Sequence, residues 1–238
     1  MSYDYLSITN EVLSRFNEVE LTSANFTTSR GFQTQCKNAI NSAVRFVNQQ
    51  EYTWPFNHAS NDETLVVGQT RYNLPTSTKL VDYETFRIRK SDSLNVVATP
   101  LKVIDYKEYI DRFVGQEDDT TLGNVPKYIF RTPDNKYGLV PYPDKAYTLT
   151  FDYYTYPEDL SASSDVPTIP ERFRSIIVDG ACMYGYEFRG ETGQFQLAEE
   201  RFKQGVKNMQ SVLLNRYDYM RSTYIPRSNR STYYTPVN

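Results

Sequence analysis

The sequence predicts an α+β protein in which N-terminal helices and a C-terminal helical hairpin form one bundle that carries an inserted antiparallel β region. Two patterns support this prediction. Apolar residues recur at helical spacing in the first fifth of the chain and again after residue 170, whereas the segment between them alternates as strands do. The length of 238 residues allows one large domain or two small ones, so size does not limit the core.

Two helices are expected at the N-terminus. The first, short helix has its apolar residues at Leu6, Val12, Leu13, Phe16 and Val19. The second has a clearer stripe, which comprises Phe32, Cys36, Ala39, Ile40, Ala43, Val44 and Val47. Both stripes predict amphipathic helices that bury one face.

Short β-rich runs follow Trp54–Phe56, and glycine and proline separate them. These runs cover residues 64–67, 71–74, 80–89 and 94–99. A short helical pattern at Tyr106, Tyr109, Ile110 and Phe113 interrupts them. Extended structure is then expected at residues 127–131, 137–140 and 147–156, and the last run alternates as a half-buried antiparallel strand does.

The C-terminal helical hairpin has the clearest start signal in the chain. Thr168 and Glu171 form a capping-box pattern, with Pro170 inside the first turn. The apolar stripe of its first helix comprises Phe173, Ile176, Ile177, Ala181, Tyr184 and Phe188. Gly190 and Gly193 mark a tight connection. The stripe of the second helix comprises Phe195, Ala198, Phe202, Val206, Met209, Val212 and Leu213.

We expect this hairpin to pack on the helix at 32–47 and to bury Ile177 and Phe202. The chain then divides into four parts: N-terminal helices of the bundle at 1–57, an inserted β-rich domain at 58–164, the hairpin at 165–216, and an extended C-terminal tail at 217–238.

Residues 216–238 hold four arginines, five tyrosines and one aspartate, and Pro226 and Pro236 prevent a regular helix. Two interpretations stay open for this segment: a solvated, disordered end, or a segment that folds onto a partner. Under the second interpretation, an interface with the portal or a neighbouring subunit would use Arg221, Tyr224, Arg227, Arg230, Tyr233 and Tyr234.

The residue counts predict no catalytic residue, no cofactor and no metal site. His58 is the single histidine, and Cys36 and Cys182 form no CxxC pair, which excludes zinc-finger and thiol-redox motifs. Both cysteines are interpreted as packing residues. His58 lacks a nucleophile motif beside it, no glycine-rich phosphate loop is present, and the acidic run at 117–119 is expected to be a solvated loop.

The charge balance and apolar runs exclude other classes. Twenty-six basic and 29 acidic side chains give a net charge of -3, which disfavours broad nucleic-acid binding. No apolar run is long enough for a membrane span, and the N-terminus has no secretory pattern, so we expect synthesis in the cytoplasm and no membrane partner. The 21 tyrosines favour assembly, because tyrosine is enriched at protein interfaces.

Five motifs, in this order after the two N-terminal helices, resemble one known family. They are WPF (54–56), GQTRYNLP (68–75), NVPKYIF (124–130), LVPYPDKAYTLTFDYYTYPEDL (139–160) and PTIPERF (167–173), which opens the helical hairpin. In this order of elements the chain resembles the head-to-tail adaptors of tailed bacteriophages, of the tail tubular protein A type.

The resemblance implies a structural protein of the virion neck, made in the host cytoplasm. It implies a ring, typically of twelve copies, that lies between the portal protein and the distal tail protein, a nozzle or a tube. The ring would extend the channel through which DNA passes as cargo. The family has no catalytic residues to transfer to this sequence.

Other functions remain open from the residues alone. The main alternative is a tyrosine-rich tail module that binds a glycan or a receptor, since aromatic faces stack on flat ligands. A nucleic-acid-binding protein that uses Tyr and Arg, an enzyme of an unfamiliar kind, and a soluble α+β domain without an inferable role are the others.

Overall fold

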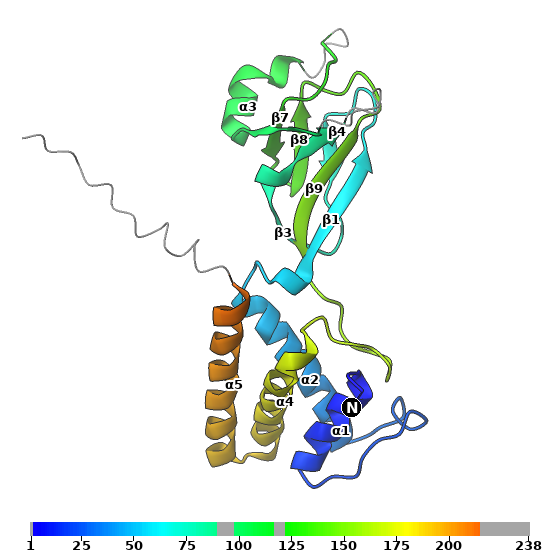
Figure 1. Ribbon diagram of the computed structural model, residues 1–238, viewed down its shortest axis with the longest axis vertical. Helices are drawn as coiled ribbons and strands as arrows, with labels where there is room; N and C mark the ends of the chain where they lie inside the picture. Colours follow the sequence, from blue (N-terminus) through cyan, green and yellow to red (C-terminus); the bar gives the residue numbers. More distant parts are fainter. Residues whose placement is uncertain (1, 90–97, 117–121, 215–238) are drawn as a thin grey trace, which may run out of the picture.

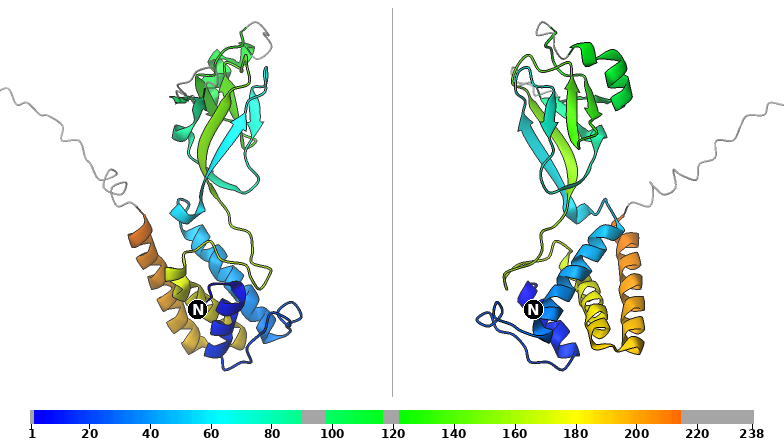
Figure 2. Two further views of the ribbon diagram at one scale, coloured as in Figure 1. Left: turned by 45° about the vertical axis from the view of Figure 1, so that its right-hand side comes forward. Right: turned by 180° about the vertical axis from the view of Figure 1, so that it is seen from behind.

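The structure is a computed structural model that describes residues 2–89, 98–116 and 122–214. It has two parts, a helical bundle and a β-sandwich, which are joined end to end at a narrow waist (Figure 1). Two further views show the same separation (Figure 2). The predicted α+β class is confirmed.

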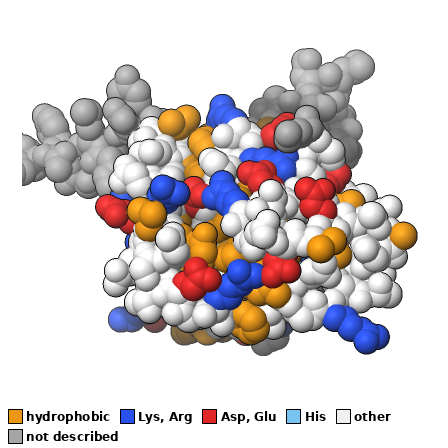
Figure 3. Space-filling view, turned by 90° about the horizontal axis from the view of Figure 1, so that it is seen from below, with side chains coloured by type: hydrophobic (Ala, Val, Ile, Leu, Met, Phe, Trp, Pro, Cys, Tyr) orange, Lys and Arg blue, Asp and Glu red, His pale blue; other side chains and the backbone are white. Residues whose placement is uncertain are grey.

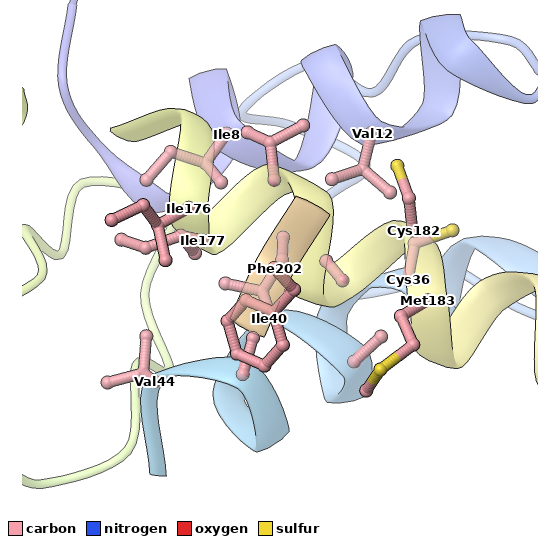
Figure 4. Packing of buried hydrophobic residues seen from close by; sticks show 14 of the residues in the cluster. Ile8, Val12, Cys36, Ile40, Val44, Ile176, Ile177, Cys182, Met183 and Phe202 are labelled. Carbon is pink, nitrogen blue, oxygen red and sulfur yellow. The ribbon is translucent and has the colours of Figure 1, made fainter. Parts of the chain in front are cut away.

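Four helices from the two ends of the described chain form the bundle. They are α1 (Tyr5–Arg15), α2 (Phe32–Gln50), α4 (Arg174–Arg189) and α5 (Thr192–Leu213). Helix α4 lies at the centre, because it packs against each of the other three. Side chains from all four helices point into one cluster, in which Ile177 and Phe202 are fully buried as expected (Figure 4).

Two glycines let neighbouring helices approach α4 closely. A Cβ atom at Gly180 would lie 2.7 Å from Cε2 of Phe202 and 2.8 Å from the Cβ atom of Ala43. A Cβ atom at Gly185 would lie 2.6 Å from the ring of Phe16. Because close-packed interiors leave no room for an extra methyl group, these positions require glycine.

Two predicted helix boundaries are wrong. The expected capping box does not cap α4, since Glu171–Phe173 form a 3-10 turn (η4) and α4 begins at Arg174 without a side-chain cap. Pro170 precedes that turn in an extended conformation, with ψ 142°, so the helical backbone starts after Pro170 instead of including it. The connection between α4 and α5 is also shorter than predicted. Of its two predicted glycines, Gly190 has a left-handed φ of 75°, whereas Gly193 already lies inside α5.

Three residues assigned to apolar stripes are exposed. Helix α1 ends at Arg15, so Val19 lies beyond it and is 76% exposed. Phe188 and Val212 lie on the last turns of α4 and α5 and are 61% and 64% exposed. Phe188 and Val212 thus lie in helices as predicted but are not buried, whereas for Val19 the predicted helix itself extends too far.

Two sheets form the sandwich. The first has the order β1 (His58–Thr64), β9 (Thr148–Thr155), β4 (Arg87–Arg89) and β5 (Ala98–Pro100), and β3 (Thr78–Val81) pairs with the remaining length of β9. The second has the order β2 (Arg71–Asn73), β8 (Lys136–Val140), β7 (Tyr128–Arg131) and β6 (Lys102–Val103). Short 3-10 turns lie at Pro55–Asn57 (η1), Tyr83–Thr85 (η2) and Val114–Gln116 (η3).

An aromatic cluster fills the space between the sheets. Phe86 and Phe151 stack with ring centroids 4.4 Å apart, and the ring of Tyr137 lies 5.4 Å from that of Phe86. On strand β9, Leu149 and Phe151 face this core, as the alternation of the sequence predicted.

Helix α3 (Tyr106–Arg112) covers the outer face of the second sheet. Tyr109 stacks on Phe130 of β7 with ring centroids 3.9 Å apart. The helix also explains a departure from the expected antiparallel region, since β6 and β7 are parallel. Parallel neighbours need a crossover connection, and the segment that contains α3 provides it.

The first strand lies outside its predicted position. Strand β1 covers residues 58–64, whereas residues 65–67 belong to a loop. The run expected at 80–89 is divided among β3, η2 and β4. Of the run expected at 94–99, only residues 98 and 99 are described, and both belong to β5.

Hydrogen bonds between α2 and the segments near the waist hold the two parts of the molecule together. Trp54 Nε1 donates a hydrogen bond of 2.9 Å to the carbonyl oxygen of Val47. Asn41 pairs with the backbone of Leu160 through two hydrogen bonds of 3.0 Å. Lys79 of β3 donates to the carbonyl oxygens of Asn48 and Glu51. The sandwich is therefore fixed to the bundle by polar contacts as well as by two chain crossings.

Candidate interaction surfaces

A groove of about 880 Å³ lies beside α1. Its lining comprises Ser2, Asp4, Leu6, Ser7, Asn10, Glu11, Ser14, Glu20, Glu171 and Arg174. Arg174 donates to Glu11 at 2.6 Å, to the carbonyl oxygen of Ser2 at 2.8 Å and to Ser7 Oγ at 2.8 Å. These bonds tie the start of α4 to α1, which gives Arg174 a structural role.

Two smaller hollows of about 350 Å³ each also have charged linings. One lies between β3 and the β7–β8 turn and includes Lys79, Arg131 and Asn135. The other lies between α1, α4 and α5 and includes Arg15, Asp179 and Arg201. Arg15 NH1 donates to Asp179 Oδ1 at 2.5 Å, so these two charges of the second hollow already pair with each other.

A fourth hollow is apolar and measures only about 10 Å³. It is lined by Thr70, Tyr109, Phe113, Leu122, Leu139, Val140, Pro141 and Tyr142. A cavity of this size holds about one water molecule, so it offers no room for a side chain.

His58 is the first residue of β1. Its Nε2 atom is 3.7 Å from Asp152 Oδ2 on β9, and Ser60 Oγ donates 2.5 Å to Asp152 Oδ1. The Asp152 carboxylate thus lies between the His58 imidazole and the Ser60 hydroxyl. In a catalytic triad the serine hydroxyl donates to the imidazole itself, so this arrangement differs from that of an activated serine. The three side chains form a polar row on the solvent side of the first sheet.

The two cysteines are buried free thiols in the bundle core, as their packing role requires (Figure 4). Burial raises the pKa of Cys36 to about 12 and that of Cys182 to about 11. Because the thiolate is the reactive form, thiols with raised pKa values are inert at neutral pH.

The remaining sequence predictions concern metal ligands, the acidic run, membrane spans and the portal interface. No group of three or more metal-ligating side chains occurs within residues 2–89, 98–116 and 122–214. The acidic run at 117–119 lies outside these ranges. No helix of the described part is long and apolar enough to cross a membrane. All six residues of the predicted portal interface, from Arg221 to Tyr234, also lie outside the described residues.

Apolar side chains are exposed at the base of the bundle, the end opposite the sandwich. There Phe188 is 61% exposed, and its ring lies 6.1 Å from that of Phe32. The guanidinium of Arg189 stands 4.1 Å over Phe32 and donates to Glu18 at 2.5 Å. Figure 3 views the molecule from this end and shows hydrophobic side chains between charged ones.

A second exposed apolar site lies at the opposite end of the molecule, where sequence reasoning placed a strand. Val66 and Val67 belong to the loop between β1 and β2 and are 55% and 59% exposed. A run of apolar residues predicts burial, so the sequence carried no signal for their exposure.

Together the fold and these surfaces define a two-part protein with exposed apolar sites at both ends. The chain matches the family described as SU10 adaptor protein over residues 3–230 and belongs to this family of bacteriophage head-to-tail adaptors. It is therefore a structural protein of the phage virion, and membership implies a place in the virion neck. No curated protein matches the chain.

Proposed function

We propose that the chain assembles into a ring, of twelve copies as the resemblance implies, that joins the portal protein to the distal tail protein and extends the DNA channel. Membership of the adaptor family over nearly the whole chain is the observation that carries this proposal. Family membership also implies interaction with portal and tail proteins. DNA passes through the ring as cargo, and the ring performs no reaction on it.

The architecture supports a role in which one chain contacts several neighbours. The bundle and the sandwich lie end to end, so their outer ends are far apart (Figure 1). Val66 and Val67 are exposed at one end and Phe188 at the other. Exposed apolar side chains of this kind are typical of protein–protein contact sites.

The portal contact is proposed from the sequence of the tail. Arginine and tyrosine dominate interface hot spots, and the tail carries both at Arg221, Tyr224, Arg227, Arg230, Tyr233 and Tyr234. The division into residues 1–57, 58–164, 165–216 and 217–238 is part of the same proposal. Twelve tails would bind cooperatively, because each docked tail raises the effective concentration of the next.

The test is reconstitution with portal rings purified from the same virus. We expect the full-length chain to co-sediment with these rings in a constant ratio, and electron microscopy to show an added ring with a central opening. The proposal fails if the chain does not bind portal rings and if virus lacking its gene still assembles complete, infectious particles.

The glycan-binding alternative gains no support from the tyrosines of the sandwich. Tyr72, Tyr109, Tyr137 and Tyr147 are buried, where a flat ligand could not stack on their rings. The exposed tyrosines of the described chain are Tyr52 and Tyr156 at the waist, and both rings lie 5.2 Å from Lys79 Nζ. They serve a contact within the chain.

A further inference from the structure

We propose that the C-terminal tail of one copy adds a strand to the free edge of β1 in a neighbouring copy, through residues 231–235. By free edge we mean the side of β1 that is turned away from β9. This inference rests on the proposed ring and deepens it, because it assigns a contact between neighbouring copies. The added strand would have the sequence STYYT.

Strand β1 lies at the edge of the first sheet. Among the described strands it pairs with β9 alone, over all seven of its residues and without a register shift. The N–H of Leu65, the next residue, donates 2.8 Å to the carbonyl oxygen of Tyr147 on the side of β9. Because backbone groups alternate in direction along an antiparallel strand, those of Ser60, Asp62 and Thr64 point away from β9. These groups form the free edge.

The free edge lacks features that usually prevent strand addition. Proteins protect long edge strands with lysine, proline or a bulge. The sequence of β1, HASNDET, contains neither lysine nor proline, and its register with β9 shows no bulge. The other strands at the ends of the two described sheets, β2, β5 and β6, cover only two or three residues. Of these edges, β1 is the one long enough to hold an added strand.

The end of the tail has the composition of a short strand. Residues 231–235 contain two threonines and two tyrosines, which favour extended structure. Pro236 follows directly, and proline ends a strand because it has no N–H group to donate. A strand of five residues measures about 16 Å, which fits within the length of β1.

The two partners carry opposite charges. Strand β1 has two acidic residues and no lysine or arginine. Asp62 lies 3.7 Å from Arg89 across the sheet, yet its side chain stays 57% exposed. Residues 219–238 contain no acidic residue, and Arg227 and Arg230 precede the proposed strand. Complementary charges of this kind steer association and suppress wrong partners.

The start of the tail and the free edge lie on opposite sides of one copy. Helix α5 ends near the waist, where β1 begins, and both figures place α5 and β1 on opposite sides of the long axis (Figure 1, Figure 2). A contact between them therefore joins two different surfaces of successive copies. Such head-to-tail contacts close into rings. Residues 215–230 extend to at most about 55 Å, which is long enough to reach a neighbour.

This pairing is compatible with the proposed portal contact of the tail. Strand addition uses backbone groups, and the side chains of the added strand alternate between its two faces. Arg221 and Tyr224 precede the added strand and take no part in it. The same tail can therefore join its own copy to a neighbour and to the portal.

Photo-crosslinking in reconstituted rings tests the partner. Tyr233 and, in a separate variant, Tyr234 are replaced by p-benzoyl-phenylalanine in the full-length chain, because successive residues of a strand face opposite sides. An equal mixture of ¹⁵N-labelled and unlabelled chains is assembled on portal rings and irradiated. We expect at least one variant to crosslink to residues 58–64 in peptide pairs that combine a labelled with an unlabelled chain. The absence of such mixed pairs from both variants would overturn the proposal.

Ser60→Pro tests whether the contact is strand addition. The N–H of Ser60 points to the free edge, so proline removes a donor for the added strand and leaves the bonds to β9 in place. We expect the parent melting temperature and at least about tenfold fewer mixed crosslinks. Ser60→Ala is the matched control, because it loses the same hydroxyl bond to Asp152 but keeps the N–H, and it should crosslink as the parent does. Parent-level crosslinking by a folded Ser60→Pro chain would exclude strand addition.

Asp62→Lys decides the question if the proline variant melts early. Lysine protects natural edge strands and would repel the arginines of the tail. The exposed ion pair with Arg89 contributes little to stability, so the variant should fold. We expect mixed crosslinks to fall at least about tenfold, whereas the same charge change at the exposed Asp111 of α3 should leave them unchanged. Equal crosslinking by the two variants would contradict the assignment of the edge.

The two proposals fail in different ways. If the parent chain binds portal rings but yields no mixed crosslinks to β1, strand addition is wrong and the adaptor function stands. If the parent chain itself does not bind portal rings, the adaptor proposal fails and this inference fails with it.

Discussion

Lys79 of β3 donates a hydrogen bond of 2.6 Å to the backbone carbonyl oxygen of Glu51, the residue at the C-cap of α2. The ammonium also bonds to the carbonyl oxygen of Asn48 and stands over the rings of Tyr52 and Tyr156. A cation at a helix C-terminus satisfies carbonyl groups that have no partner in the helix and complements the helix dipole. Lys79 therefore couples the sandwich to the bundle.

Lys79→Met should destabilise this junction. The loss of a charged donor to two carbonyl oxygens is expected to lower the free energy of unfolding by about 1–3 kcal/mol, toward the lower end because the site is partly solvated. Urea unfolding measures the change, and Lys107→Met on the exposed face of α3 serves as the control. Equal midpoints for the two variants would show that Lys79 does not stabilise the waist.

Gly180→Ala should destabilise the bundle although alanine favours helices. The new methyl group would collide with Phe202 and Ala43, and overpacking of this kind costs about 1–3 kcal/mol, more than the gain in helix propensity of about 1 kcal/mol. Gly193→Ala in α5 is the matched control, because no atom lies within 4 Å of a Cβ there. We expect that control to be neutral or slightly more stable in thermal unfolding. A melting temperature for Gly180→Ala at or above the parent value would contradict the close packing.

Phe202→Ala should be among the most destabilising single changes in α5. The side chain is fully buried, and its ring lies 5.1 Å from that of Phe46. Truncating a buried phenylalanine costs about 3–5 kcal/mol, so the melting temperature should fall sharply. Leu197→Ala, at a position that is 45% exposed on the same helix, should change it little. The core assignment would be wrong if both variants melted like the parent.

Lowering the pH should break the hydrogen bonds within the turn at residues 161–165. The backbone N–H groups of Ser161 and Ala162 each donate 2.7 Å to Asp165 Oδ2, and they lower the pKa of that carboxyl group. Because the folded-state pKa lies below the unfolded value of about 3.9, the contribution to stability is complete above that pH. It is lost as the pH falls through the folded-state pKa.

The amide proton shifts of Ser161 and Ala162 report this titration by NMR. They should move together as the pH falls, and Asp165→Asn should abolish the movement. The same turn contacts α1, since the Tyr5 N–H donates 2.8 Å to the carbonyl oxygen of Asp165. Unchanged shifts between pH 5 and pH 2 would contradict the assignment.

Truncation after Tyr217 should separate folding from attachment. The described cores contain no residue beyond Leu214, so the melting temperature should stay close to that of the full chain. Co-sedimentation with portal rings should be lost, because the six arginines and tyrosines proposed for that contact are removed. Equal co-sedimentation of the truncated and full chains would exclude the tail as the anchor.

Much of the fold could be predicted because its apolar periods are strong. Leu149 and Phe151 of β9 and Ile177 and Phe202 of the hairpin lie inside, as their spacing predicted. Strand β1 was missed because its sequence, HASNDET, contains no alternating apolar residues. It is a strand because all seven of its residues pair with β9, a contact between distant segments that a local pattern does not encode.

The surfaces were harder to predict than the cores. Val19 and Phe188 were assigned to apolar helical stripes and Val66 to a β-rich run, yet each is exposed. A sequence pattern cannot distinguish a residue that is buried in its own chain from one that is kept for another chain, because the same hydrophobic effect applies to both. The contacts proposed for the C-terminal tail were predicted from composition and stay predictions.

The course of β1 and β9 determines how the sandwich would carry a mechanical load. β1 runs from the waist to the loop at residues 65–70, and β9 runs back beside it over the full register from His58 with Tyr154 to Thr64 with Thr148. A pull between this loop and the bundle therefore acts along the covalent backbone of β1, with β9 hydrogen-bonded beside it, and the hydrogen bonds between the strands are not its only resistance. The sandwich can transmit tension to the bundle without first separating its strands.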